Sequence, residues 1–166
     1  IPISDVPQAI TRKLFRTTIQ IIHDGLQNDF GIKNPRICVA GLNPHASEGG
    51  KIGGEDIDRI APWVTEFQAQ GLSITGPHSA DTMFHTTARA KYDVALCMYH
   101  DQALIPIKTL DFFGGVNVTL GLPIVRTSPD HGTAFDIAGQ GIADATSMIQ
   151  AIRTADHMIK ARKNAN

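Results

Sequence analysis

The stretch DVALCMYHDQ, residues 93–102, is a nearly continuous apolar run that leads into the imidazole of His100 and the carboxylate of Asp101. An apolar run of this length without polar alternation is typical of a strand buried on both faces, as in a parallel sheet. Ligands of open parallel sheets bind at the carboxyl ends of the strands. The sequence therefore predicts that His100 and Asp101 lie where the chemistry takes place.

A second stretch has the same design, because the apolar residues 37–42 lead directly into Asn43, Pro44 and His45. If both predicted strands are parallel members of one sheet, His45 and His100 lie at the same edge, and two imidazoles at one edge suggest a metal site. Taken alone, each histidine is better explained as an ordinary residue that hydrogen-bonds to the backbone. A catalytic metal would also need another ligand and an open position for substrate.

Composition sets the class of protein. A chain of 166 residues, of which 42% are hydrophobic and 19% charged, is typical of a single globular domain with a real core. The formal net charge of −1 gives no reason to expect a nucleic acid or an anionic membrane as partner. No apolar run is long enough to span a membrane, and the first residues do not resemble a signal peptide. Cys38 and Cys97 fall within predicted strands, so we expect free thiols and a cytoplasmic location.

Hydrophobic periodicity predicts the elements around these strands. Apolar residues at helical spacing predict one helix from Asp5 to about Asn28, one that ends at Gly71 and is kinked or delayed by Pro62, and one that begins near Asp144. Short strands are expected at residues 72–75, 116–120 and 124–127, with a break at Gly76-Pro77 and a short helix from Ser79 to Ala90. Strands that alternate with helices favour a layered α/β sheet.

Several polar residues among apolar neighbours are further candidates for the site. Asp101 could orient a substrate, accept a proton or hold a metal-binding histidine, whereas the spacing of Asp81 also fits the first turn of a helix. Lys108 and Arg126 could bind a phosphate or a carboxylate, or simply extend to water at the end of an apolar segment. Asn117 stands within an alternating strand pattern.

Residues 130–144 are dense in glycine and other small residues. Such a loop allows the backbone to approach a ligand closely, and the carboxylate of Asp136 could accept hydrogen bonds from a ribose. The chain has no G-x-G-x-x-G motif that opens a helix, so an ordinary Rossmann site is not supported. The remaining histidines are expected to be structural or solvated: His23, His78, His85 and His157.

Taken together, these segments resemble the 4-hydroxythreonine-4-phosphate dehydrogenases. The similarity lies in GLNPHA (41–46) with EGG (48–50), MYHDQ (98–102), NVTLGLP (117–123), RTS (126–128) and DHGTA (130–134), in this order. The resemblance implies NAD- or NADP-dependent oxidation of a phosphorylated amino acid in pyridoxal 5'-phosphate synthesis. It also implies a three-layer α/β/α fold similar to that of isocitrate and isopropylmalate dehydrogenases, and a homodimer with its active site at the subunit interface.

The resemblance also assigns roles to the candidate residues. His45 and His100 would bind a divalent metal, with Zn²⁺, Co²⁺, Ni²⁺, Mn²⁺ or Mg²⁺ all compatible with imidazole and carboxylate ligands. Asp81 and Asp101 would be active-site carboxylates. The segment from 131 to 144 would bind the adenosine part of the cofactor. The residues implied in substrate binding are Lys108, Asn117 and Arg126, and those implied in cofactor binding are His131, Gly132, Thr133, Ala134, Asp136 and Asp144.

Members of this family are considerably longer, so the chain is expected to be a C-terminal fragment with little activity alone. Residues 1–124 would form a metal-binding, substrate-binding and dimerisation subdomain, and residues 125–166 would return to the dinucleotide-binding subdomain. The motifs leave open a phosphorylated four-carbon sugar acid, threonate or erythronate 4-phosphate, as substrate. A non-catalytic dimerising fragment is a further alternative, and a phosphate acyltransferase on a related fold is a more distant one.

Overall fold

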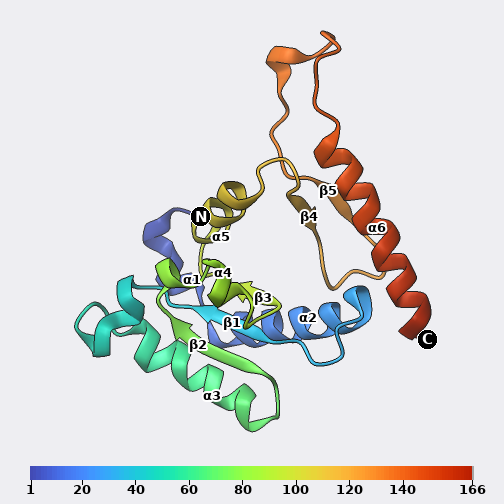
Figure 1. The fold of residues 1–166 in the computed structure, drawn as a ribbon. Coiled ribbons are helices and arrows are strands. Elements are labelled where there is room, and N and C mark those ends of the chain that lie inside the picture. The colour runs from blue at the N-terminus through green and yellow to red at the C-terminus, as the bar shows by residue number, and fades with distance from the viewer. Residues whose placement is uncertain (166) are drawn as a thin grey trace.

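A computed structural model describes residues 1–165, which form an α/β structure around a three-stranded parallel sheet (Figure 1). The strand order is β2-β1-β3, with β1 at Ile37–Ala40, β2 at Ile74–His78 and β3 at Val94–Leu96. Ile37 of β1 is in register with Ile74 on one side and Val94 on the other. The two strands expected to lead to the histidines are therefore parallel neighbours, which is the condition that the metal-site hypothesis sets.

The two faces of β1 divide the core into two clusters, because successive side chains of a strand point to opposite faces. Ile37 and Val39 pack with residues of helices α2 (Arg12–Phe30) and α3 (Ala61–Ala69). Cys38 and Ala40 pack with Met83 and its apolar neighbours on the other face. The helices α2 and α3 thus cover one face of the sheet, and the segment from 80 to 92 covers the other.

The prediction of a single helix from Asp5 is wrong, because the helical backbone is interrupted at Ile10 and Thr11. A short helical segment forms η1 (Ile3–Asp5) and α1 (Val6–Ala9), and α2 begins anew at Arg12. The hydroxyl of Thr11 accepts a hydrogen bond from the backbone of Leu14, which caps α2. The guanidinium of Arg59 donates to the carbonyls of Pro7 and Ile10 and so holds the interruption.

A kink and a late start were both left open at Pro62, and the structure shows an α-helix that starts at Ala61 directly after a π-helical turn. A π-helical turn, η3 (Asp56–Ile60), precedes α3, and Pro62 lies in the first turn of α3, where its missing N–H costs nothing. The strand does not end at the break predicted at Gly76-Pro77, because β2 continues to His78. The regular pairing with β1 is nevertheless broken there, since Cys38 pairs with Thr75 and Ala40 with His78. Since β2 is an edge strand, a proline there interrupts no ladder on its outer side.

The segment from 79 to 90 forms two short helices, η4 (Ala80–Thr82) and α4 (Thr86–Arg89), rather than one. The hydroxyl of Ser79 donates to the carboxylate of Asp81 at 2.5 Å and does not cap η4. Helix α5 (His100–Leu110) then follows β3.

The last third of the chain forms an antiparallel hairpin and a long helix. Strands β4 (Val116–Val118) and β5 (Thr127–Pro129) pair, and α6 (Thr146–Ala165) packs along them, as Figure 1 shows. The second of these strands begins later than predicted. Helix α6 begins two residues after Asp144, whose carboxylate accepts a hydrogen bond from the backbone of Thr146.

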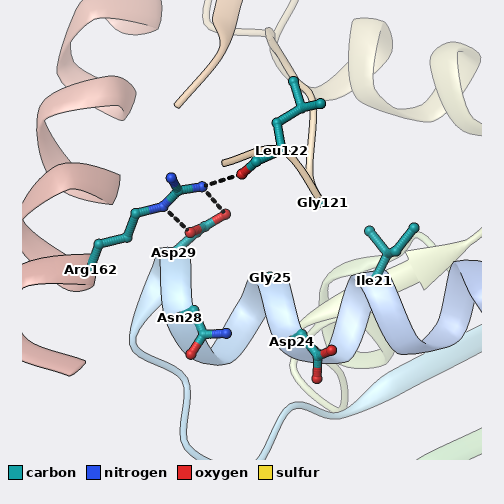
Figure 2. Close-up of a pocket in the computed structure, with 8 residues that line it drawn as sticks. All are labelled: Ile21, Asp24, Gly25, Asn28, Asp29, Gly121, Leu122 and Arg162. Carbon is teal, nitrogen blue, oxygen red and sulfur yellow. Dashed lines mark hydrogen bonds and ion pairs between the residues drawn. The ribbon is translucent and has the colours of Figure 1, made fainter. Parts of the chain in front are cut away.

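An ion pair joins α6 to α2, and the same arginine together with close packing holds the hairpin there (Figure 2). The guanidinium of Arg162 binds the buried carboxylate of Asp29 at 2.6 Å and donates to the carbonyl of Leu122 at 3.2 Å. Gly25 lets Leu120 approach α2, since a Cβ there would lie 2.9 Å from the Leu120 side chain. None of the helices in residues 1–165 has both the length and the hydropathy needed to cross a membrane.

Candidate active site

The carboxyl ends of β1 and β3 lie at one edge of the sheet, as expected for parallel neighbours. Beyond β1 the chain passes through Gly41 to His45, and beyond β3 it reaches His100. The predicted strand through Tyr99 is too long, because β3 ends at Leu96 and its residues are only half-buried. The reason is the position of β3 at the edge of the sheet, whereas all four residues of the central strand β1 are buried.

His100 is the first residue of α5 rather than the last residue of a strand. Its Nδ1 lies 2.8 Å from Oδ1 of Asp101, and both side chains are largely exposed. A carboxylate that engages one imidazole nitrogen fixes the ring and leaves Nε2 available, which is the usual arrangement of metal-binding histidines. Asp101 also lies in the first turn of α5, where the helix dipole favours a negative charge.

Gln102 is a site residue that sequence reasoning missed. Its side chain is 8% exposed, donates from Nε2 to the carbonyl of Gly41 at 2.8 Å and accepts from the backbone N–H of Met98 at 2.7 Å. One amide therefore joins the segments that follow β1 and β3. A buried residue that pairs with two backbone groups leaves no periodic signal in the sequence, so only its place beside His100 could have drawn attention to it.

Two cavities flank this junction, and Tyr99 and Asp101 line both of them. The first, of about 380 Å³, is also lined by His100 and by apolar residues of the N-terminal segment. The second, of about 410 Å³, brings Asp81 together with Asp101 beside an apolar wall that includes Phe84 and Ile105. The structure thus places the two candidate carboxylates on one cavity.

His45 lies on a backbone turn of unusual conformation within η2 (Pro44–Gly50). The four non-glycine residues from His45 to Glu48 all have positive φ, between 42° and 68°. This left-handed conformation costs each L-residue about 1–2 kcal/mol. Strained backbone of this kind persists only where surrounding contacts hold it, and it concentrates at functional sites.

The two candidate metal ligands, His45 and His100, follow β1 and β3 at this edge of the sheet. Both imidazoles are exposed, and His100 has one nitrogen held by a carboxylate. In residues 1–165 no group of three or more histidine, cysteine or acidic side chains gathers closely enough to hold a metal. Burial raises the pKa of the Cys97 thiol to about 11, so it stays protonated at neutral pH and is a poor metal ligand or nucleophile.

The predicted substrate-binding residues come from α5 and the hairpin. The ammonium of Lys108 donates to the carbonyl of Asp130 at 2.9 Å and lies 5.2 Å from the ring of Phe112. Asn117 lies in β4, and the guanidinium of Arg126 donates to the hydroxyl of Thr119 at 2.9 Å.

Asn117 and Arg126 lie on the same face of the hairpin. The pairing of Asn117 with Ser128 places Thr119 opposite Arg126, so all of these residues share one face. Thr127, which points to the other face, donates to a carbonyl of α6. Helix α6 therefore covers one face of the hairpin and leaves Asn117 and Arg126 exposed on the other.

The predicted cofactor loop extends away from the rest of the chain between β5 and α6 (Figure 1). All of its candidate residues are exposed: His131, Gly132, Thr133, Ala134, Asp136 and Asp144. Asp136 lies in a short helical turn, η5 (Phe135–Ile137), that follows Ala134 at a φ of 46°. The hydrogen bond from Thr146 lowers the pKa of Asp144 and ties this carboxylate to the start of α6.

Comparisons with known proteins agree on one family. The family model described as "Pyridoxal phosphate biosynthetic protein PdxA" matches residues 1–155. A 4-hydroxythreonine-4-phosphate dehydrogenase of Roseobacter denitrificans is 63% identical over 158 residues, which cover 95% of this chain and 48% of that protein. The chain thus spans about half the length of the curated relatives it matches.

Two solved structures illustrate the similarity of fold. The crystal structure of 4-hydroxythreonine-4-phosphate dehydrogenase from Klebsiella pneumoniae matches with a TM-score of 0.83 at 43% identity, over 95% of this chain and 48% of that one. A terephthalate 1,2-cis-dihydrodiol dehydrogenase from Burkholderia xenovorans matches with a TM-score of 0.74 at 30% identity, over 95% of this chain and 50% of that one.

Proposed function

The chain belongs to the PdxA family of pyridoxal phosphate biosynthetic proteins, and from this we propose that, at the full length of its relatives, it oxidises 4-hydroxythreonine 4-phosphate. The reaction uses NAD or NADP and a divalent metal, and the β-keto acid it yields loses CO₂. The observation that best supports this proposal is the convergence of two histidine-bearing segments at one sheet edge, joined by Gln102.

His45 and His100 are the proposed metal ligands, and a bound cation supplies the Lewis acidity that makes the substrate hydroxyl easier to deprotonate. Asp101 engages Nδ1 of His100, which would leave Nε2 of this ring available to bind a metal. Asp81, on the same cavity as Asp101, would accept the hydroxyl proton or orient the substrate. The apolar wall of that cavity would lie beside the reacting carbon.

Substrate anions are proposed to bind Lys108, Asn117 and Arg126. The exposed face of the hairpin offers the guanidinium and the amide, and Arg126 can bind a phosphate through two parallel hydrogen bonds. Lys108 would exchange part of its contact with Asp130 for the substrate. These residues fix the approach of the substrate, which is catalysis by positioning. In the cofactor loop, Asp136 would accept hydrogen bonds from a ribose of NAD. The nicotinamide ring of the same cofactor would accept the hydride.

We propose that the protein acts as a homodimer with the active site at the interface, in the cytoplasm. Exposed apolar side chains next to the second cavity, Ile105, Leu110 and Phe112, support a buried contact there. Two free cysteines agree with a reducing compartment.

The central test is replacement of a proposed metal ligand. In the chain at the full length of its relatives, His100→Ala is expected to abolish metal-dependent NADH or NADPH formation from 4-hydroxythreonine 4-phosphate. His85→Ala, which changes another exposed histidine, should keep wild-type activity. Near-normal turnover by His100→Ala in metal-depleted buffer would contradict the proposal. The isolated 166-residue chain is expected to show little or no activity.

A second candidate substrate is a phosphorylated four-carbon sugar acid, threonate or erythronate 4-phosphate. A 30% identical relative is named for a dihydrodiol, which is a different alcohol, and this supports testing more than one substrate. The roles proposed for Lys108, Asn117 and Arg126 concern the anionic groups that all three compounds carry, so these roles do not separate the amino acid from the sugar acids. A comparison of kcat/KM for the amino acid and for both sugar acids decides between them.

A further inference from the structure

The turn that carries His45 has a left-handed backbone conformation that its own residues do not favour. Six consecutive residues from His45 to Gly50 have positive φ, and only the last two of them are glycine. The turn also folds back onto the end of β1, where a Cβ at Gly41 would lie 2.9 Å from Cα of Ala46. Because L-residues disfavour this region, contacts from outside the turn must hold it.

Those contacts come from one buried carboxylate, Asp56, at the start of η3. Its side chain is fully buried and accepts three hydrogen bonds: from the backbone N–H of Leu42 at 2.6 Å, from that of Asn43 at 2.9 Å, and from the hydroxyl of Ser47 at 2.8 Å. Hydrogen bonds to a charged acceptor are the strongest kind in proteins. The three donors lie on both sides of His45, so Asp56 fixes the turn at its two ends.

A second set of contacts supports the same arrangement. The amide of Asn43 donates to Oε2 of Glu55 at 2.9 Å and to the hydroxyl of Ser47 at 3.3 Å. The bond from Asn43 lowers the pKa of Glu55 and keeps it ionised. The backbone of Ile52 donates to the carbonyl of Ser47 at 3.1 Å and closes the segment. Ser47 is itself fully buried, so neither Ser47 nor Asp56 can reach a ligand.

We propose that Asp56 is a positioning residue, which sets the affinity of the metal site by holding the left-handed turn that presents the imidazole of His45. This inference rests on the proposed function, because it takes His45 as a metal ligand. Loss of a residue that orients a ligand typically lowers metal affinity by a factor of about 10–100. Asp58, an exposed carboxylate two residues further along, has no contact with the turn among the hydrogen bonds of the described residues.

The test measures Co²⁺ binding by calorimetry and by visible absorption, in the metal-depleted protein at the full length of its relatives. Asp56→Asn removes the charge and one acceptor, and is expected to weaken Co²⁺ binding by about tenfold or more. Asp58→Asn makes the same chemical change and should leave the affinity at the wild-type value. His45→Ala serves as the reference for loss of a ligand. Circular dichroism and thermal melting report whether each variant is folded.

The possible outcomes distinguish the positioning role of Asp56 from the proposed metal site at His45 and His100. If His45→Ala weakens Co²⁺ binding but Asp56→Asn only lowers the melting temperature, Asp56 is merely structural and the inference is wrong. If His45→Ala keeps the wild-type affinity, the proposed metal site is wrong and the role of Asp56 is wrong with it. Should Asp56→Asn fail to fold, Ser47→Ala decides, because it removes one of the three bonds; unchanged Co²⁺ affinity in that variant would then overturn the inference.

Discussion

Asp93 shows how a single side chain fixes the start of a strand. Its carboxylate accepts hydrogen bonds from the backbone N–H, Nε and a terminal nitrogen of Arg36, at 2.8, 3.1 and 2.8 Å. Arg36 precedes β1 and Asp93 precedes β3, so this pair aligns the first residues of the two strands. The guanidinium lowers the pKa of Asp93 from its ordinary value of 3.8.

This lowered pKa predicts a defined pH dependence. A carboxylate whose pKa is depressed in the folded state stabilises the fold above its ordinary pKa, and this contribution is lost as the pH falls through the depressed value. Asp93→Asn is therefore expected to lower the melting temperature by about 3 °C at pH 7. The difference from the wild type should shrink as the pH falls below 3.8.

Thermal melts of the full-length protein at pH 7, 5, 4 and 3 measure this difference. Asp156→Asn is a matched control, since its carboxylate forms an exposed i,i+4 pair with Lys160 and should contribute little at any pH. A difference between Asp93→Asn and the wild type that stays constant down to pH 3 would contradict the assignment.

At the scale of elements, the residues that lead out of β1 and β3 are held together by one side chain rather than by the sheet. Gln102 replaces the missing backbone ladder beyond Leu96 with two hydrogen bonds, to Gly41 and from Met98. The relative position of the His45 and His100 segments thus depends on a buried amide.

Gln102→Glu tests this dependence with almost no change of shape. The glutamate can still accept from Met98 but, when ionised, places an oxygen against the carbonyl of Gly41 and leaves a buried charge unpaired. We expect kcat/KM to fall by at least about tenfold, which is a loss of about 1.4 kcal/mol of transition-state stabilisation. Gln20→Glu, on the exposed surface of α2, should have no effect. Equal kcat/KM for Gln102→Glu and the wild type would show that the junction holds without this amide.

How far sequence predicts these elements depends on burial. The central strand β1 was predicted well because all of its residues are buried and its apolar run is bounded by turn residues. The bounds of the edge strands were predicted less well, since β3 is shorter than its apolar run and β2 includes a glycine and a proline. The interruption at Thr11 was missed, because the apolar spacing continues across it while Arg59, far along the chain, provides the bonds that hold it.

The candidate site shows the same limit. The parallel arrangement of the two histidine-bearing segments followed from local pattern, and the placement of Asp81 beside Asp101 agrees with it. The left-handed turn at His45 and the buried anchors Gln102 and Asp56 did not follow, because each depends on contacts between residues distant in sequence. The roles of the substrate and cofactor residues stay predictions.

At the scale of the whole molecule, the exposed apolar surface of α5 and the segment after it predicts self-association. Ile105 is 65% exposed and Phe112 61%, and both lie close to proposed site residues, Ile105 in the cavity of Asp81 and Phe112 against Lys108. Exposed apolar patches of this kind mark interaction surfaces. A dimer that covers them would also shield the site from water.

Ile105→Asp is therefore expected to shift the full-length protein from dimer to monomer in analytical ultracentrifugation and to reduce metal-dependent turnover by at least about tenfold, since a charge buried in an apolar contact is costly. Lys33→Asp, which changes an exposed charge away from this surface, should leave both unchanged. A variant Ile105→Asp that remains a dimer would place the subunit contact elsewhere.

The ion pair between Asp29 and Arg162 has a consequence for engineering. These residues stand 133 positions apart, and the same guanidinium also binds the carbonyls of Leu122 and Pro123 in the connection between β4 and β5. Libraries that vary the hairpin to change substrate preference must therefore keep Asp29 and the final turns of α6 intact. Without these contacts the hairpin would lose its attachment to α2. Substitutions at Asn117 or Arg126 would then be selected first for restoring the hairpin and only afterwards for binding a new substrate.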